Sequence, residues 1–344
     1  MQALYGRPVF SVDGDTFFWE DVVLDAMRRG AWTRFQREVR DGLACLAEAE
    51  ATGELPEEAI EEAAREFRYQ RDLVSAQEIE AWLEARDLSV REWMDHIGRG
   101  VLRDLAAPRI AAVLKLYPPS PQALQSALAV DLVCSGLGSS LANELAEQAA
   151  AAAAAGAELE EAELDPLRST APLLVPPGLA PERAGERLTF LARLDRGAKR
   201  FRQAAVSPEA VQREIGHQQT EWIRIDCRTI GFPDEIRAHE AALCLREDGL
   251  SLDEVADAAR TSVADSRFYL DELDPGLRPM FLAARSIDVL GPIPFDGSHT
   301  LFRVLDKVMP SVQDPEILRR ARAAVLDRAL ADQVRRRVEW QLDW

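Results

Sequence analysis

The sequence predicts an α+β protein that is mostly helical, with a small antiparallel sheet in its C-terminal half. Three observations support this fold class. Apolar residues recur at helical spacing through much of the first 155 residues and again after residue 314. Polar and apolar residues alternate between Glu221 and Ile230, as in a half-buried strand. The turn signals Gly291-Pro292 and Asp296-Gly297 flank short apolar runs, as between paired strands.

Residues 1–155 predict an N-terminal helical domain. It opens with an extended segment over residues 8–18, which turns at an Asp-Gly pair. Capping boxes at Ser75-x-x-Glu78 and Ser89-x-x-Glu92 open two short helices, because hydroxyl and carboxylate satisfy each other's free backbone amides. A further helix is expected from residue 121 through the alanine run that ends this domain.

The rest of the chain divides into four parts. Residues 156–181 contain an acidic cluster and five prolines, which oppose helix and sheet pairing, so they predict a linker. Residues 182–220 predict connecting helices. The strand, helices and paired strands between 221 and 308 predict a small α+β domain. Residues 314–344 predict a last long helix that begins at an Asp-Pro pair.

Length, composition and charge exclude several classes of protein. A chain of 344 residues with 47% hydrophobic residues can form two or three globular domains. The formal net charge of −18 argues against nucleic acid or an anionic membrane surface as a partner, because both attract clustered positive charge. We find neither a signal-peptide pattern at the N-terminus nor an apolar run long enough to span a bilayer, so we expect a cytoplasmic protein.

The cysteines and the common ligand motifs give no indication of a cofactor or a metal. The four cysteines form no C-x-x-C or C-x-x-H pair, so buried reduced thiols are expected. A Walker loop, a G-x-G-x-x-G after a strand, H-E-x-x-H and G-x-S-x-G are all missing from the sequence. Nucleotide, nicotinamide, zincin and serine-hydrolase chemistry therefore have no support. The cysteines are Cys45, Cys134, Cys227 and Cys244.

The order of elements from Trp222 to Lys307 resembles the parvulin-type peptidyl-prolyl isomerases. In that family a Gly-x-His tract places its histidine in the proline pocket, and Gly297-Ser-His299 matches the tract. The whole chain is similar to SurA-like and PrsA-like parvulin chaperones, in which the C-terminal helix packs on the helical domain. It also resembles the PpiC-related peptide maturation proteins encoded beside ribosomally made peptides, on residues 67–103 and the Asp314-Pro315 to Trp340 ending.

The resemblance implies a proline site whose catalytic residues are incomplete. His299 would be the second histidine, and Asp226 stands nearest to the position of the first. The glycine-rich loop of the family has no counterpart in residues 260–267. Each assignment has a plain alternative: His299 as an ordinary strand residue, Asp226 as the ion-pair partner of a neighbouring arginine, and the apolar cup as core. The residues of the implied cup are Leu277, Met280, Phe281 and Leu282.

The resemblance and the incomplete site lead to three possible functions. The fold alone does not decide between them, because function depends on the site. The first is a non-catalytic, chaperone-like accessory protein that holds a ribosomally made precursor peptide by its leader while a partner enzyme modifies it. It would use a groove of the helical domain and a sheet edge. The second is an active peptidyl-prolyl cis–trans isomerase with a divergent site. The third is a dimeric scaffold subunit for a peptide-modifying enzyme. The aromatic anchors expected in the groove are Trp32, Trp82 and Trp93.

Overall fold

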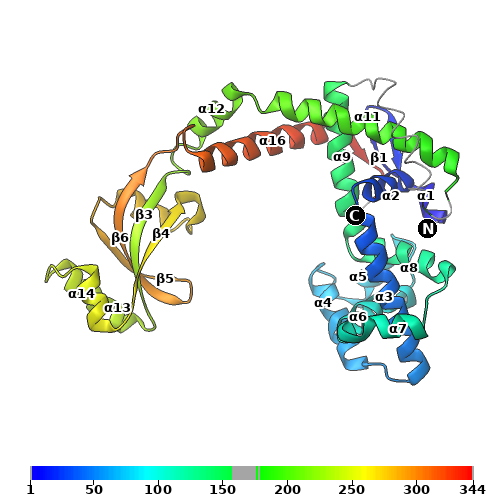
Figure 1. Ribbon diagram of the computed structural model, residues 1–344, viewed down its shortest axis with the longest axis horizontal. Coiled ribbons are helices and arrows are strands. Elements are labelled where there is room, and N and C mark those ends of the chain that lie inside the picture. The colour runs from blue at the N-terminus through cyan, green and yellow to red at the C-terminus, as the bar shows by residue number, and fades with distance from the viewer. Residues whose placement is uncertain (1, 157–175, 177–178, 343–344) are drawn as a thin grey trace. The chain divides into compact units, whose positions relative to one another are not determined.

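The computed structural model describes residues 2–156, 176 and 179–342 (Figure 1). It is α+β and mostly helical, with two small antiparallel sheets, which confirms the predicted fold class. Most of the segment interpreted as a Pro-rich acidic linker, residues 156–181, lies outside the described residues. Among the described residues no single helix is long and apolar enough to cross a bilayer. The helices α8 (Pro121–Cys134) and α9 (Leu137–Ala155) pass that test only as a pair, and the pair is bent by 73°.

The chain forms two compact units. The first unit contains Met1–Ala204 and Ala329–Trp344, and the second contains Ala205–Arg328. The elements of the first unit are α1 Gln2–Tyr5, β1 Pro8–Val12, β2 Asp15–Phe18, α2 Trp19–Arg28, α3 Ala31–Thr52, α4 Glu57–Tyr69, α5 Ala76–Glu84, α6 Val90–Leu105, the 3-10 helix η1 Ala107–Arg109, α7 Ile110–Leu116, α8 Pro121–Cys134, α9 Leu137–Ala155, α11 Pro181–Ala205 and β7 Val338–Trp340.

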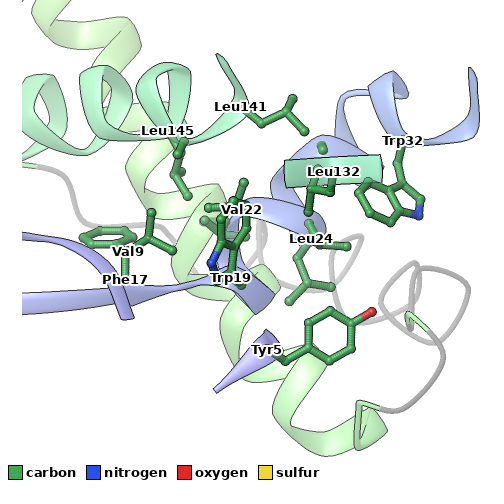
Figure 2. Packing of buried hydrophobic residues seen from close by; sticks show 14 of the residues in the cluster. Tyr5, Val9, Phe17, Trp19, Val22, Leu24, Trp32, Leu132, Leu141 and Leu145 are labelled. Carbon is green, nitrogen blue, oxygen red and sulfur yellow. The ribbon is translucent and has the colours of Figure 1, made fainter. Parts of the chain in front are cut away.

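The core of the first unit lies where its sheet meets α2, α9 and α11. Figure 2 shows side chains from β1, α2 and α9 converging in this core, among them Val9, Trp19 and Leu145. Helix α11 adds Leu188 and Leu191, which are almost fully buried. Residues 181–205 are therefore a core helix of the first unit and not a connection between domains.

A close approach between two helices fixes α11 in place. A Cβ atom added at Gly197 of α11 would lie 2.9 Å from backbone and side-chain atoms of Ala152 on α9. Arg187 of α11 also donates two hydrogen bonds, of 2.5 and 2.7 Å, to the fully buried Asp21 of α2. A buried carboxylate needs such a partner, because desolvation of an unpaired charge is costly.

The second unit contains a four-stranded antiparallel sheet in the order β4-β3-β6-β5, within the residues where a small antiparallel sheet was predicted. Figure 1 shows its strands with α13 and α14 beside them. Its elements are α12 Pro208–His217, β3 Arg224–Phe232, α13 Glu235–Arg246, α14 Leu252–Ala259, β4 Val263–Tyr269, the 3-10 helix η3 Leu270–Glu272, α15 Arg278–Ala283, β5 Val289–Phe295, β6 Ser298–Val308 and, up to its residue 328, α16 Pro315–Arg337.

The C-terminal helix α16 differs from its predicted packing. Its buried residues Ile317 and Ala321 pack with Trp222 inside the second unit. Arg328 of α16 donates hydrogen bonds of 2.7 and 2.8 Å to the buried carboxylate of Glu214 on α12. Residues 315–328 of this helix therefore pack inside the second unit, whereas residues 329–337 belong to the first unit, on which the whole helix was expected to pack. The segment after the helix, β7, instead adds a third strand to the first unit's sheet by pairing with β1.

Candidate functional site

The four-stranded sheet of the second unit has two faces that are covered by different helices. On one face Cys227 of β3 and Phe302 of β6 pack with Phe281 of α15. We call this the α15 face. On the other face Phe232 of β3 and Leu301 of β6 pack with α13 and α14. We call this the α13–α14 face. The two faces decide which of the predicted site residues can meet, because successive strand residues point to opposite sides.

His299 lies on the α13–α14 face and not beside the implied cup. It stands opposite Phe232 on β3 and Pro294 on β5. Since Leu301 of the same strand packs on the α13–α14 face, His299, two residues earlier, points to that side as well. The expected meeting of this histidine with Met280 and Phe281 is therefore contradicted by the structure.

Asp226 lies near the other end of β3, where two arginines bind its carboxylate. Arg224 donates hydrogen bonds of 3.1 and 3.2 Å, and Arg267 of β4 donates one of 3.0 Å. Asp226 precedes Phe232, the partner of His299, by six residues of β3, which at about 3.3 Å per residue is a separation of about 20 Å. His299 and Asp226 therefore cannot act on the same amide bond. The ion-pair interpretation of Asp226 is the one that the geometry supports.

The implied proline cup is part of the hydrophobic core. The ring of Phe281 is 1% exposed, and it packs edge-on against Phe268 and Phe302 with ring centroids 5.4 Å away in both cases. Leu277 and Met280 are partly buried against the same cluster, and Leu282 is exposed. Phe281 is therefore closed to a ligand in this conformation.

Sequence reasoning missed an aromatic ring that contacts this cluster and is open to solvent. Phe295, the last residue of β5, is 42% exposed and stands edge-on to Phe302 at 5.4 Å. Its position directly before the Asp296-Gly297 turn was a signal that could have identified it. Cys227 lies on the same face but offers no nucleophile, because burial raises the pKa of its thiol to about 12.

Two of the three expected tryptophan anchors are core residues of the first unit. Trp32 and Trp93 are 4% and 6% exposed. Trp82 is half-buried: Phe67 packs edge-on against its ring at 5.6 Å, and the guanidinium of Arg86 lies 4.3 Å from the ring centroid. The structure does not support Trp32 or Trp93 as side chains that a peptide contacts.

A cleft on the second unit was also not predicted. It has a volume of about 710 Å³ and lies between α13 and α14, with Phe232 of β3 in its wall. It extends to Arg260 and Thr261, which lead directly into β4. Its position depends on how two helices separated by a loop pack together, which no local sequence pattern reveals. Its other apolar lining residues include Ala241, Cys244, Leu250, Val255, Ala258 and Ala259.

The two edges of this sheet differ in their ability to accept another strand. The edge strand β5 contains Pro292 and Pro294, which have no backbone N–H to donate. The other edge strand, β4, is seven residues long and contains no proline. Its side chains Asp265 and Arg267 are 91% and 67% exposed. The β4 edge therefore has the free backbone groups that an added strand requires.

Comparisons with known proteins give only weak likeness, and only to solved structures. No protein-family model matches the chain, and no curated protein matches it. Among solved structures it is similar to the chain described as the crystal structure of PrsA from Bacillus subtilis, with 12% sequence identity and a TM-score of 0.22. That match covers 62% of this chain and 86% of the PrsA chain. At this TM-score the likeness supports no statement about a site or an activity.

Proposed function

We propose that this protein is a non-catalytic, chaperone-like accessory protein of the cytoplasm that binds an extended peptide through its second unit. The peptide would be a ribosomally made precursor, held by its leader while a peptide-modifying enzyme acts on it. The observation that carries the proposal is the separation of His299 and Asp226 along β3. Rotation of a peptide bond crosses a barrier of about 18–20 kcal/mol, and an isomerase needs polar groups that converge on the twisting amide.

The β4 edge and the cleft beside it support the mode of binding. An extended peptide that adds to a sheet edge gains affinity from backbone hydrogen bonds, and pockets for its side chains give specificity. The cleft between α13 and α14 reaches the residues that lead into β4. A peptide paired with β4 would therefore place an apolar side chain in the cleft near Val255 and Leu250.

Binding is tested by fluorescence anisotropy with labelled, overlapping synthetic peptides that cover any short open reading frame found beside the gene. We expect at least one to bind, and we expect Ala258→Glu to weaken it about ten-fold, because the change puts a carboxylate into the apolar cleft. Ala323→Glu is the matched control, since Ala323 is an exposed alanine of α16 that does not line the cleft. No binding by any peptide, or equal loss in both variants, would count against the proposal.

A protease-coupled assay with proline peptides separates this function from isomerase activity. We expect cis–trans conversion in the presence of the protein to be as slow as the uncatalysed reaction, which takes tens to hundreds of seconds. An acceleration that His299→Ala removes would show that the histidine acts in catalysis and would refute the non-catalytic proposal.

A further inference from the structure

A cleft of the first unit takes no part in the function proposed above. It has a volume of about 990 Å³ and is lined by α3, α6 and the start of α9. Its walls are mainly apolar, and the residues Phe35, Val39 and Ile97 in them are buried. Eight ionisable side chains also line it, and three of them, His96, Arg99 and Asp131, contact one another. An apolar cleft with a few converging polar groups is the usual form of a small-ligand site.

Asp131 of α8 organises the polar side chains of this cleft. It is 6% exposed, and it accepts a hydrogen bond of 2.9 Å from Nδ1 of His96 and a pair of hydrogen bonds from the guanidinium of Arg99. Burial works to raise the pKa of Asp131, but the hydrogen bonds from His96 and Arg99 outweigh it and hold the pKa below its ordinary value. The carboxylate is therefore ionised at neutral pH and orients both donors.

The hydrogen bond to Asp131 fixes which histidine nitrogen can meet a ligand. Nδ1 of His96 is occupied by the carboxylate, so Nε2 is the ring nitrogen left for another partner. Arg99 is held at this position by a close helix approach: a Cβ added at Gly42 of α3 would lie 2.9 Å from Cβ of Arg99. The imidazole and guanidinium are thus fixed by packing, which lowers the ordering cost of binding.

The residues that line this cleft include one more arginine than carboxylates, although Arg29 among them also pairs with Asp25 and Glu144 outside the lining. Four arginines line it against three carboxylates, those of Glu38, Asp104 and Asp131, whereas the chain carries a net charge of −18. Arg34 and Arg103 stand at the rim, and each forms an ion pair with Glu38, at 2.8 and 3.8 Å. The side chain of Arg34 is 87% exposed, so it can turn towards a ligand at small cost.

We propose that this cleft binds a carboxylate that is attached to an apolar body. The rim arginines Arg34 and Arg103 would hold the carboxylate by charge-assisted hydrogen bonds, and Ala31, Val101 and Leu137, lining residues that are not fully buried, would contact the apolar part. The C-terminal end of a peptide with an apolar last residue and a free fatty acid share this chemistry. The inference does not rest on the proposed function of the second unit, because all of these residues belong to the first unit.

Isothermal titration calorimetry with the full-length protein tests the proposal by measuring its affinity for three probes. They are N-acetyl-Ala-Ala-Leu with a free carboxylate, the same tripeptide as its C-terminal amide, and decanoate. We expect the tripeptide acid to bind at least about ten-fold more tightly than its amide. Binding of decanoate without binding of the tripeptide acid would support the carboxylate site and assign it to acyl chains. Equal binding of acid and amide with no binding of decanoate, or no binding of any probe, would overturn the proposal.

Variants locate the binding in the cleft. We expect Arg103→Gln to weaken the binding of the acid about ten-fold. Arg34→Gln, an exposed rim change with little effect on folding, should weaken it in the same direction. Arg65→Gln is the matched control, since this α4 arginine is half-exposed, pairs with Glu62 and does not line the cleft. Unchanged affinity in both Arg34→Gln and Arg103→Gln would overturn the assignment to this cleft, and thermal unfolding of each variant checks that it is folded.

Discussion

The first unit brings a histidine and an aspartate together, whereas the second unit keeps such a pair apart. His96 and Asp131 are on different helices, yet their side chains meet at 2.9 Å and share Arg99 as a neighbour. His299 and Asp226 are on adjacent strands, and the register places them near opposite ends of β3. Helix packing can join residues at any sequence spacing, but a strand carries its residues apart by about 3.3 Å at each step. Two residues on neighbouring strands or helices therefore do not necessarily belong to the same site.

Removal of the arginine partner should have the largest effect and should differ between the two pairs. Arg99→Ala leaves a buried carboxylate with one partner fewer, so we expect a loss of about 3–5 kcal/mol in the free energy of unfolding. Arg267→Ala removes a mostly exposed partner of Asp226, and we expect a loss below about 1 kcal/mol. Urea unfolding of both variants measures the difference. Equal losses would mean that the buried and exposed pairs are energetically alike.

A substitution in the aromatic cluster tests whether α15 provides core or a ligand cup. Phe281→Ala removes a fully buried ring, so we expect a loss of about 3–5 kcal/mol in the stability of the second unit. Leu282→Ala changes the next residue, which is exposed, and should reduce the free energy of unfolding much less. Unfolding in denaturant, monitored by hydrogen exchange of the backbone amides of β3 and β6, measures the stability of the second unit separately. A Phe281→Ala protein of unchanged stability would indicate an open cup.

Acid should weaken the first unit through Asp131. The folded-state pKa of this group lies below its unfolded value of about 3.9, so its ion pair stabilises the fold above that value. This contribution is lost as the pH falls through the folded-state pKa. Hydrogen exchange of α6 and α8 measured from neutral pH down to strong acid should show the loss, and Asp131→Asn should remove that part of the pH dependence. A pH profile identical in both proteins would contradict the assignment.

The smallest effect is expected for the histidine of the second unit. His299→Ala removes a half-exposed strand side chain that lies away from the aromatic cluster, so we expect a change in stability within about 0.5 kcal/mol. Thermal unfolding of the full-length variant measures this change. A loss of several kcal/mol would show that His299 is part of the packing between β6 and α13–α14, and the contrast with His96 would then be weaker.

Local features of the fold could be predicted from the sequence because their causes are local. The capping boxes Ser75–Glu78 and Ser89–Glu92 begin α5 and α6 as expected. The alternation after Glu221 becomes β3, and the Asp296-Gly297 turn joins β5 to β6. The segment Val338–Trp340 was expected to be helical, but it pairs with β1 as β7, because a distant strand supplies its hydrogen bonds.

The candidate sites could not be predicted in the same way, because they depend on contacts between distant residues. The resemblance correctly located β6 and its Gly-x-His tract, but the register of β3 against β6 decides that His299 faces Phe232. The contact of His96 with Asp131 joins residues that are 35 positions apart in no recognisable motif. Burial of Trp93 and Phe281 likewise follows from packing around them, since an apolar residue looks the same in a core as in a binding groove.

The pairing of β7 with β1 has a consequence for the order of events during synthesis. Residues 338–340 leave the ribosome long after Pro8–Val12, so the first unit completes its sheet only after the chain has emerged as far as residue 340. The second unit, which is continuous from 205 to 328, can assemble its strands earlier. A nascent chain halted before Val338 would therefore expose the edge of β1 that β7 otherwise covers. Molecular chaperones would encounter the chain with this edge unpaired.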